Sequence, residues 1–252
     1  MGRLQPQQRF HWGVKRKIWL PMVRLASLPL APHRAAPIRR RTLRAGGPFA
    51  SRVIVMVKEP IVGRVKTRLA HEIGAVRATA FYRAASQAVL ARVARPGGWR
   101  TELGVTPDAA IASAVWPRSF ARRAQGNGDL GERMQRVMDK APPGPVVVIG
   151  TDVPLIRSAH IQAALKALGS HDAVLGPSPD GGYWLVGLKR RPRVPRAFKS
   201  VEWSSREALE QTLANLSGLS VAKIASLPDV DEARDLASAG SAVGRIVLPA
   251  VG

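Results

Sequence analysis

Short apolar runs alternate with longer amphipathic segments along the chain after about residue 50. The runs at 53–57 and 146–149 are typical of buried strands, and 146–149 is predicted to be a central parallel strand because every residue in it is apolar. Further strands are predicted at 100–105, 172–175, 183–188 and 221–224, and residues 120–124 form either a short strand or an irregular segment.

Helices are predicted between these strands. Gly74 separates a first helix at 66–73 from an Ala-rich helix at 75–94. Asp129 is a predicted N-cap, with Glu132 as its capping-box partner, for a helix that ends near Lys140. Other helices are expected at 108–114, at 158–168, at 203–216 with Ser204 or Ser205 as cap, and at 228–236 with Asp229 or Asp231 as cap. The alternation of strands and helices over 52–238 predicts an α/β sheet.

Positive charge is unevenly distributed along the 252 residues, whose net charge is +22. Residues 1–50 contain eleven Lys or Arg and no Asp or Glu, which is half of the excess in a fifth of the chain. We expect this segment to be a disordered tail or the result of a start codon assigned too far upstream. A targeting segment and a nucleic-acid-binding arm are the alternatives. A catalytic domain is expected at 51–240 and a short tail at 241–252.

Composition excludes several kinds of site. The sequence has no cysteine, which excludes disulfides, thiolate nucleophiles and Cys-based metal sites and is consistent with the predicted cytoplasmic location. No apolar run is long enough to span a bilayer. A P-loop is excluded because Val65, and not glycine, precedes Lys66 and Thr67. Aromatic residues are 5% of the chain, and no motif that reads DNA or RNA is present.

Cations follow the first predicted strand. Lys58, Arg64, Lys66 and Arg68 crowd the turn between that strand and the next helix. Ligands of open α/β sheets bind beyond the carboxyl ends of the strands, and helix N-termini attract anions. The turn is therefore a candidate phosphate site, although a solvated basic turn would have the same composition.

Acidic residues follow later strands. Asp152 lies just beyond 146–149, where a carboxylate is suited to a metal ion or a substrate, or alternatively caps the turn. Asp180, Asp229 and Asp231 follow other predicted strands. A site for a nucleotide diphosphate requires cations that bind the phosphates and carboxylates that bind Mg²⁺. Mg²⁺ is typically bound by one or two carboxylates.

Five stretches together resemble a known family. They are K-E-P-I-V-G-R-V-K-T-R-L-A at 58–70, G-D-L-G-E-R-M at 128–134, G-T-D-V-P at 150–154, G-P-S-P-D-G-G-Y-W-L-V-G-L at 176–188 and D-V-D-E-A-R-D-L at 229–236. In this order they are similar to bacterial GT-A-type glycosyltransferases assigned to arsenosugar biosynthesis. That family resembles the guanylyltransferases for 2-phospho-L-lactate and for the molybdenum cofactor. The resemblance covers about residues 52–238.

The resemblance implies a Rossmann-like nucleotide-diphospho-sugar transferase (GT-A) fold, a mostly parallel central sheet with helices on both faces. It also implies a set of site residues. Lys66 and Asp152 are the implied catalytic residues, and Mg²⁺ or Mn²⁺ is the implied cofactor, held by Asp152 and Asp231. Asp152 matches the acid of the Asp-x-Asp metal motif, but the chain has Thr151-Asp152 and not two acids two residues apart, which leaves the second ligand open. The implied nucleotide-binding residues are Lys58, Gly63, Lys66, Arg68, Gly128 and Asp129, and the implied substrate-binding residues are Asp180, Gly181, Gly182 and Tyr183.

The leading hypothesis is a Mg²⁺-dependent glycosyltransferase with a nucleotide-sugar donor and a small-molecule acceptor. The alternative is a nucleotidyltransferase that uses a nucleoside triphosphate and releases pyrophosphate. Molybdenum-cofactor guanylyltransferases usually open with a glycine-rich L-A-G-G-x-S-x-R-M loop, whereas residues 57–68 read V-K-E-P-I-V-G-R-V-K-T-R, which favours glycosyl transfer. A nucleic-acid-binding protein acting through residues 1–50 and a non-catalytic nucleotide-binding member are the remaining hypotheses.

Overall fold

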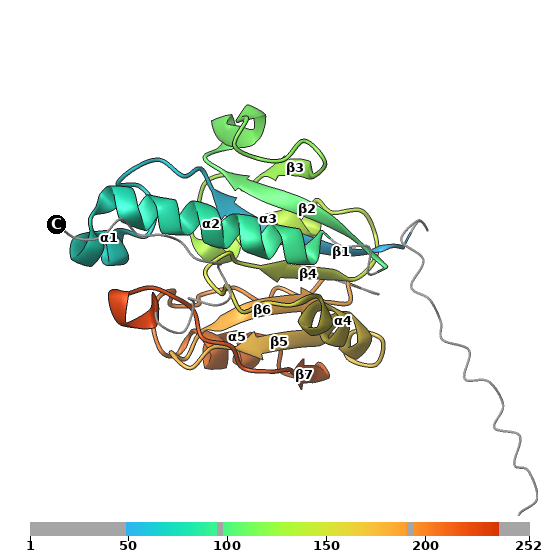
Figure 1. Ribbon diagram of the computed structural model, residues 1–252. Coiled ribbons are helices and arrows are strands. Elements are labelled where there is room, and N and C mark those ends of the chain that lie inside the picture. The colour runs from blue at the N-terminus through green and yellow to red at the C-terminus, as the bar shows by residue number, and fades with distance from the viewer. Residues whose placement is uncertain (1–48, 95–97, 191–193, 237–252) are drawn as a thin grey trace, which may run out of the picture. The chain divides into compact units, whose positions relative to one another are not determined.

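The computed structural model describes residues 49–94, 98–190 and 194–236, all within one compact unit. Nearly all of the predicted tails at 1–50 and 241–252 lies outside the described residues. The described part of the chain forms a seven-stranded sheet in the order β3-β2-β1-β4-β6-β5-β7 (Figure 1). The strands are β1 (Ser51–Lys58), β2 (Trp99–Thr106), β3 (Ala121–Ala124), β4 (Val146–Ile149), β5 (Ala173–Pro177), β6 (Tyr183–Leu188) and β7 (Val221–Lys223).

The sheet is mostly parallel, as predicted. Strand β6 runs antiparallel to both of its neighbours, β4 and β5, and the other pairings in the described sheet are parallel. The carboxyl ends of all strands except β6 therefore lie at one edge of the sheet, together with the amino end of β6. We call this the carboxyl edge. It gathers the segments that follow β1, β2, β3, β4 and β7, and the turn between β5 and β6.

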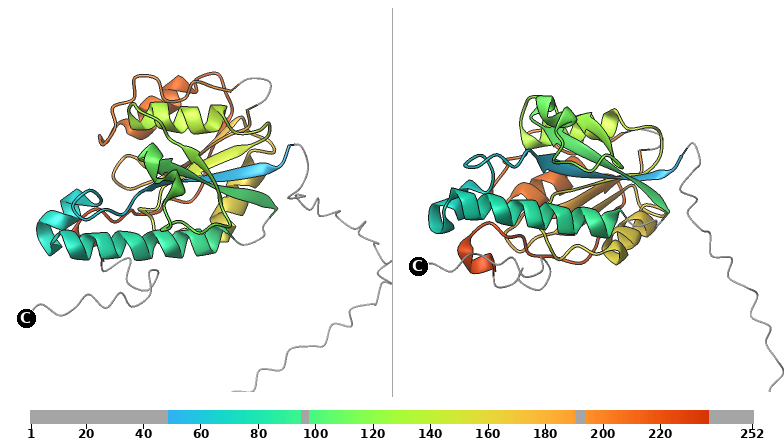
Figure 2. Two further views of the ribbon diagram at one scale, coloured as in Figure 1. Left: turned by 90° about the horizontal axis from the view of Figure 1, so that it is seen from above. Right: turned by 45° about the horizontal axis from the view of Figure 1, so that its top comes forward.

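Helices cover both faces of this sheet (Figure 2). They are α1 (Thr67–Ile73), α2 (Ala75–Val93), α3 (Leu130–Asp139), α4 (Ser158–Ala167) and α5 (Ala208–Asn215), with short 3₁₀ helices η1 (Asp108–Ala112) and η2 (Ala233–Asp235). Helices α2 and α4 pack in one hydrophobic cluster, and α3 and α5 pack in another on the opposite face. The arrangement is the α/β fold that the sequence predicts.

The two clusters explain why the central strands read as continuous apolar runs. In β1, Val53 and Val55 belong to the cluster with α2 and α4, whereas Ile54 between them belongs to the cluster with α3 and α5. In β4, Val147 and Val148 divide in the same way. Each face of the strand is buried, so no polar residue is required at alternate positions.

The capping box predicted for α3 is confirmed. The amide of Glu132 donates to Oδ1 of Asp129 at 2.8 Å, and the amide of Asp129 donates to Oε2 of Glu132 at 3.0 Å. These bonds satisfy backbone donors that the first turn of a helix leaves without intrahelical partners.

The prediction for the start of α5 was wrong. The helix begins at Ala208, with Glu207 and neither Ser204 nor Ser205 as its N-cap. Ser204 has a left-handed backbone (φ 65°), and the Ser205 hydroxyl donates to the carbonyl of Glu202. Both serines are therefore used in a turn that precedes the helix.

The predicted last helix at 228–236 is also wrong in its extent. The structure has a 3₁₀ turn, η2, capped by Glu232 and not by Asp229 or Asp231. The amide of Val230 donates to the carbonyl of Asp152 at 3.0 Å. This bond joins the backbone before η2 to the segment after β4, and the helical turn begins only at Ala233.

A buried ion-pair cluster joins the first three strands of the sheet. Nε of Arg52 lies 3.2 Å from Oε1 of Glu102, and Nε of Arg123 donates to Oε2 of Glu102 at 2.9 Å. The residues Arg52 and Glu102 are 5% and 7% exposed, so these charges are removed from water. No motif in the sequence predicted this cluster, because each residue pairs with a partner on a different strand.

Candidate active site

The carboxyl edge of the sheet contains a cavity of about 640 Å³, which we call the cationic cavity. Segments after β1, β3, β4 and β7 contribute to its wall, as does the β5–β6 turn. Its charged lining residues are Lys58, Arg64, Lys66, Arg68, Asp152, Asp180, Asp229 and Asp231. The cations and carboxylates that the sequence assigned to separate strand ends therefore share one cavity.

Lys66 is the central residue of this cavity. Its Nζ donates to Oδ1 of Asp231 at 2.8 Å and to the carbonyl of Val230 at 2.7 Å, and it lies 2.6 Å from Oδ1 of Asp152. The side chain of Lys66 is 6% exposed, whereas those of Asp152 and Asp231 are 49% and 41% exposed. One buried ammonium group thus joins the segment after β4 to the segment after β7.

Local backbone geometry directs Lys66 into the cavity. Lys66 has a left-handed backbone conformation, with φ 48° and ψ 51°, at the residue before α1. Such a conformation is uncommon for a residue with a side chain and is found where surrounding contacts fix it. The three contacts of the ammonium group supply that constraint here.

Electrostatics keeps Lys66 charged. Burial by itself lowers the pKa of this ammonium group, but attraction by Asp152 and Asp231 outweighs burial and raises the pKa above its ordinary value. The positive charge is therefore permanent at neutral pH. Asp152 and Asp231 each form an ion pair with this ammonium group.

The pair Asp152 and Asp231 fits the requirements of a divalent cation. Both Oδ1 atoms lie within hydrogen-bond distance of Nζ of Lys66, so the two carboxylates lie close together. Groups of three or more His, Cys, Asp or Glu arranged for a metal are absent from the described residues. Mg²⁺ and Mn²⁺ do not require such a cage, because one or two carboxylates, water and substrate phosphates complete the coordination of Mg²⁺. The metal roles of Asp152 and Asp231 remain predictions.

The other cations leave donors available for an anion. Lys58 and Arg64 line the cavity, and no ion pair joins either to a carboxylate within the described ranges. NH1 of Arg68 lies 3.5 Å from Oδ2 of Asp231, but its side chain is 63% exposed. This side of the cavity therefore has the charge that a phosphate group requires.

Tyr82 and Gln125 line the same cavity and were not predicted from the sequence. The hydroxyl of Tyr82 accepts a hydrogen bond from the amide of Lys58 at 2.8 Å, and burial raises the pKa of that phenol. Nε2 of Gln125 donates to the carbonyls of Val57 and Gly104. Both side chains fix the ends of β1 and β2 at the cavity wall. They were missed because an isolated polar residue in an Ala-rich helix, or beside glycines in a loop, has no motif around it.

Two further carboxylates lie beside the Lys66 cluster. Burial raises the pKa of Asp229 to about 6, and the neighbouring charges of Asp180 and Asp231 contribute to the increase. The amide of Gly182 donates to Oδ1 of Asp180 at 3.0 Å. A raised carboxyl pKa of this kind is typical of functional sites.

A second cavity of about 270 Å³ adjoins the first and shares Asp152, Asp180 and Asp229 with it. We call it the aromatic cavity because Tyr183, Trp184 and Trp203 line it. Its other large apolar lining residues are Met56, Leu130, Met134, Val148, Ile149, Val153, Leu185 and Val186. Of the predicted substrate-binding residues, Asp180, Gly182 and Tyr183 lie in its wall.

Several predicted site residues do not line either cavity, namely Gly63, Gly128, Asp129 and Gly181. Asp129 contributes its carboxylate to the cap of α3. A Cβ on Gly181 would lie 2.2 Å from the carbonyl oxygen of Arg206, and its φ is +91°. Gly181 is therefore required for a close approach between two backbone segments. The ligand-binding roles of these four residues stay predictions.

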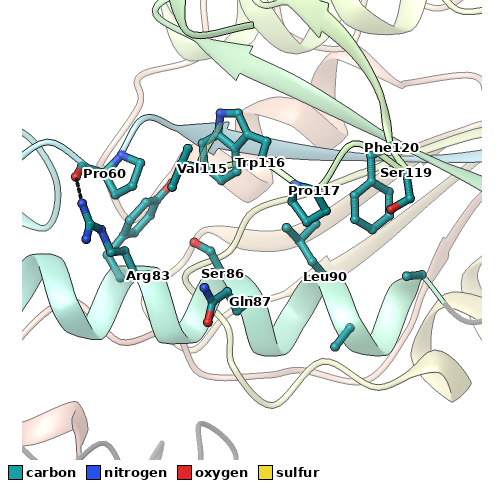
Figure 3. A pocket seen from close by; sticks show the side chains of 13 residues that line it. Pro60, Arg83, Ser86, Gln87, Leu90, Val115, Trp116, Pro117, Ser119 and Phe120 are labelled. Atoms are coloured by element: carbon teal, nitrogen blue, oxygen red, sulfur yellow. Dashed lines mark hydrogen bonds between the residues drawn. The ribbon is translucent and has the colours of Figure 1, made fainter. Parts of the chain in front are cut away.

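A third cavity, of about 450 Å³, lies between α2 and residues 115–120 (Figure 3). Its wall is mostly apolar, including Leu90, Trp116 and Phe120. Arg83 is its charged lining residue within the described part of the chain, and NH2 of Arg83 donates to the carbonyl of Pro60 at 3.3 Å. The third cavity lacks the carboxylates of the other two, so we assign the candidate site to the carboxyl edge.

Among the described residues, no helix combines the length and the apolar character needed to cross a bilayer.

One solved structure shares both fold and sequence with this chain. A proposed nucleotide-diphospho-sugar transferase from Desulfovibrio desulfuricans G20 is 30% identical, with a TM-score of 0.67 over 73% of this chain and 83% of that chain. The chain belongs to the family of that protein. The family model described as "Uncharacterized protein conserved in bacteria (DUF2064)" also matches residues 89–205.

Two further proteins resemble this chain, one in a short stretch of sequence and one in fold. A 2-phospho-L-lactate guanylyltransferase from Methanocaldococcus sp. (strain FS406-22) is 31% identical over 62 residues, which are 25% of this chain and about a quarter (27%) of that protein. A 4-diphosphocytidyl-2C-methyl-D-erythritol synthase from Anaerococcus prevotii DSM 20548 shares the fold at 11% identity, with a TM-score of 0.51 over 77% of this chain and 98% of that one.

These comparisons confirm the predicted nucleotide-diphospho-sugar transferase fold and the similarity to 2-phospho-L-lactate guanylyltransferases. The chain is thus a member of a family of transferases that act on nucleotides. The assignment to arsenosugar biosynthesis is not tested by them and stays a prediction.

Proposed function

We propose that this protein is a divalent-metal-dependent glycosyltransferase that uses a nucleotide sugar as donor and a small molecule as acceptor. The observation that supports it most directly is the position of Lys66 between Asp152 and Asp231 in the cationic cavity. A cation-lined wall next to two converging carboxylates is suited to a diphosphate whose charge is shared between the protein and a metal ion.

Each group has a distinct task in this proposal. Lys58, Arg64 and Arg68 bind the phosphate oxygens, and Asp152 and Asp231 hold the metal. When bound, the metal neutralises charge on the departing diphosphate. The acceptor hydroxyl oxygen bonds to the anomeric carbon of the donor, and the bond from that carbon to the diphosphate breaks with its electron pair on phosphate oxygen. The hydroxyl proton passes to water or to a carboxylate in the wall.

A nucleotidyltransferase is the second candidate, supported by the match to a 2-phospho-L-lactate guanylyltransferase. In that reaction an acceptor phosphate bonds to the α-phosphorus of a nucleoside triphosphate, and pyrophosphate leaves. The same cations and carboxylates would neutralise the pyrophosphate. The cationic cavity is compatible with both reactions, so the released product is the distinguishing observable.

The test is an incubation of the full-length protein with nucleotide sugars and nucleoside triphosphates of each common base, with and without Mg²⁺. Release of a nucleoside diphosphate supports glycosyl transfer, and release of pyrophosphate supports the alternative. Asp152→Asn should reduce turnover on the order of a hundredfold, because it removes a charge from the proposed metal site without a change of shape. Glu210→Gln, an exposed residue on α5 that lines neither cavity, is the matched control. Metal-independent turnover at the wild-type rate in Asp152→Asn would refute the proposal.

A further inference from the structure

The aromatic cavity differs from the cationic cavity because no cation lines it within the described residues, whereas four cations and four carboxylates line the cationic cavity. Its described lining residues include Asp152, Asp180 and Asp229 and no Lys, Arg or His. The positive groups of the site all lie in the adjoining cationic cavity. A ligand that spans both cavities would therefore have an anionic group at one end only.

Two of these carboxylates have no ion-pair partner among the described residues. Asp152 is paired with Lys66, but no Lys, Arg or His of the described chain forms an ion pair with Asp180 or Asp229. Asp229 is half-buried, where a nearby charge is screened less by water and salt than it would be at an open surface. A phosphate or carboxylate placed in the aromatic cavity would be repelled by both residues.

The rest of the wall is suited to an apolar body with oxygen atoms on it. Met56, Leu130 and Met134 supply aliphatic surface, and Trp184 and Trp203 supply aromatic surface. The buried indole nitrogen of Trp203 has no hydrogen-bond partner in the described part of the chain. Because that nitrogen is buried, a ligand in the cavity would contact the ring of Trp203 and not its N–H. The carboxylates of Asp180 and Asp229 are hydrogen-bond acceptors, so a ligand hydroxyl group could donate to either of them.

We infer that the aromatic cavity binds an acceptor that carries a hydroxyl group on an apolar body and has no phosphate or carboxylate group. This inference rests on the proposed function, because it assigns the cationic cavity to the donor. It separates the two candidate reactions: a nucleotidyltransferase of the guanylyltransferase type would place an anionic acceptor phosphate in a cavity that no described cation lines, whereas glycosyl transfer to a hydroxyl group would not. The wall of this cavity thus favours glycosyl transfer.

The test compares phenyl β-D-glucoside with phenyl phosphate, which share an apolar ring and differ in charge. Full-length protein is first saturated with inorganic pyrophosphate and Mg²⁺ at physiological salt, so that the cationic cavity is occupied. Affinities are then measured by ligand-observed NMR and calorimetry. We expect the glucoside to bind the wild type about tenfold more tightly than phenyl phosphate, because two unpaired carboxylates repel the latter.

Paired variants locate the effect. Asp180→Asn combined with Asp229→Asn should raise the affinity for phenyl phosphate about tenfold and leave that for the glucoside within a factor of about three. Glu210→Gln should change neither.

Two outcomes overturn the inference: phenyl phosphate that binds the pyrophosphate-saturated wild type as tightly as the glucoside, or a glucoside that does not bind at millimolar concentration. Pyrophosphate binding is measured first and reports on the proposed function separately. If pyrophosphate and Mg²⁺ do not bind, the proposed function fails. If they bind and phenyl phosphate matches the glucoside, the failure is confined to the acceptor class.

Discussion

Nζ of Lys66 lies 2.6 Å from Oδ1 of Asp152, although Lys66 follows β1 and Asp152 follows β4 along the chain. Strands β1 and β4 are parallel neighbours, so the residues that follow them meet at the same edge. Asp231 reaches the same ammonium group from the segment after β7. The contact thus brings three distant parts of the sequence to one point and is the centre of the functional account.

Replacement of Lys66 by Met should weaken Mg²⁺-dependent binding of a nucleoside diphosphate by about one to two orders of magnitude, because it removes the buried charge that holds Asp152 and Asp231 close together. The loss in free energy of unfolding should be smaller than the loss in binding free energy, because Asp152 and Asp231 are half-exposed and remain solvated without Lys66. Calorimetric titration with Mg²⁺ present measures the affinity. Lys166→Met, at the exposed end of α4, is the control. A nucleotide affinity equal to wild type in Lys66→Met would exclude a role of Lys66 in nucleotide binding.

Asp229→Asn should make the protein more stable at neutral pH and not at acid pH. The pKa of Asp229 in the folded protein is about 6, above the value of about 3.9 for an unfolded chain, so the folded state holds this proton more tightly. The contribution of Asp229 to the free energy of unfolding of the wild type is therefore fully present below the pKa of the unfolded chain. It is lost as the pH rises through about 6, the pKa of the folded protein. Since the residue is half-exposed, the gain at neutral pH should be no more than about 1 kcal/mol.

Urea unfolding of Asp229→Asn and wild type between about pH 4 and pH 7.5 measures this difference. The two curves should converge at the acid end. Equal stability across the whole range would show that Asp229 is not strained by its neighbours. When both proteins also carry Asp180→Asn, the difference in stability between them at neutral pH should be smaller, because the Asp180 charge contributes to the raised pKa of Asp229.

Glu102→Gln should cost about 3 kcal/mol of unfolding free energy, because it leaves Arg52 charged in a buried position without its carboxylate partner. Nucleotide affinity should not change, since Glu102 lines neither cavity at the carboxyl edge. Chemical unfolding gives the stability and calorimetry gives the affinity. A loss below about 1 kcal/mol would show that the cluster is solvated like a surface pair.

Asp129→Ala distinguishes a structural residue from a ligand-binding one. Loss of the cap bond to Glu132 should cost about 1 kcal/mol. If the cap is the whole role of Asp129, nucleotide affinity in the folded variant should equal that of wild type. A selective fall in affinity, with stability restored by Asp129→Ser, would instead support the nucleotide-binding role that the family resemblance implies.

The sequence predicted the elements whose pattern is local. The strands at 146–149 and 183–188 and the cap of α3 at Asp129 follow from apolar runs and from two residues at fixed spacing. The segments at 203–216 and 228–236 were mispredicted because long-range contacts override their local helical pattern. The bond from Val230 to Asp152, for example, joins two segments far apart in sequence.

The candidate site likewise has features that the local sequence predicts and features that depend on the topology of the sheet. Lys66, Asp152 and Asp231 were predicted from charged motifs at strand ends, whereas their mutual contact required the topology. Gln125 and Trp203 carry no motif, and their positions depend on which strands are neighbours. Gly181 was assigned to a ligand, but the segment it approaches closely is the backbone of Arg206, which lies on a later loop.

The most direct test of the central claim is a Mn²⁺ titration of the full-length protein in the presence of a nucleoside diphosphate, followed by the EPR signal of free Mn²⁺. The account predicts that Asp152→Asn and Asp231→Asn each weaken Mn²⁺ binding by about one to two orders of magnitude, while Glu210→Gln binds like wild type. Wild-type Mn²⁺ affinity in both aspartate variants would contradict it.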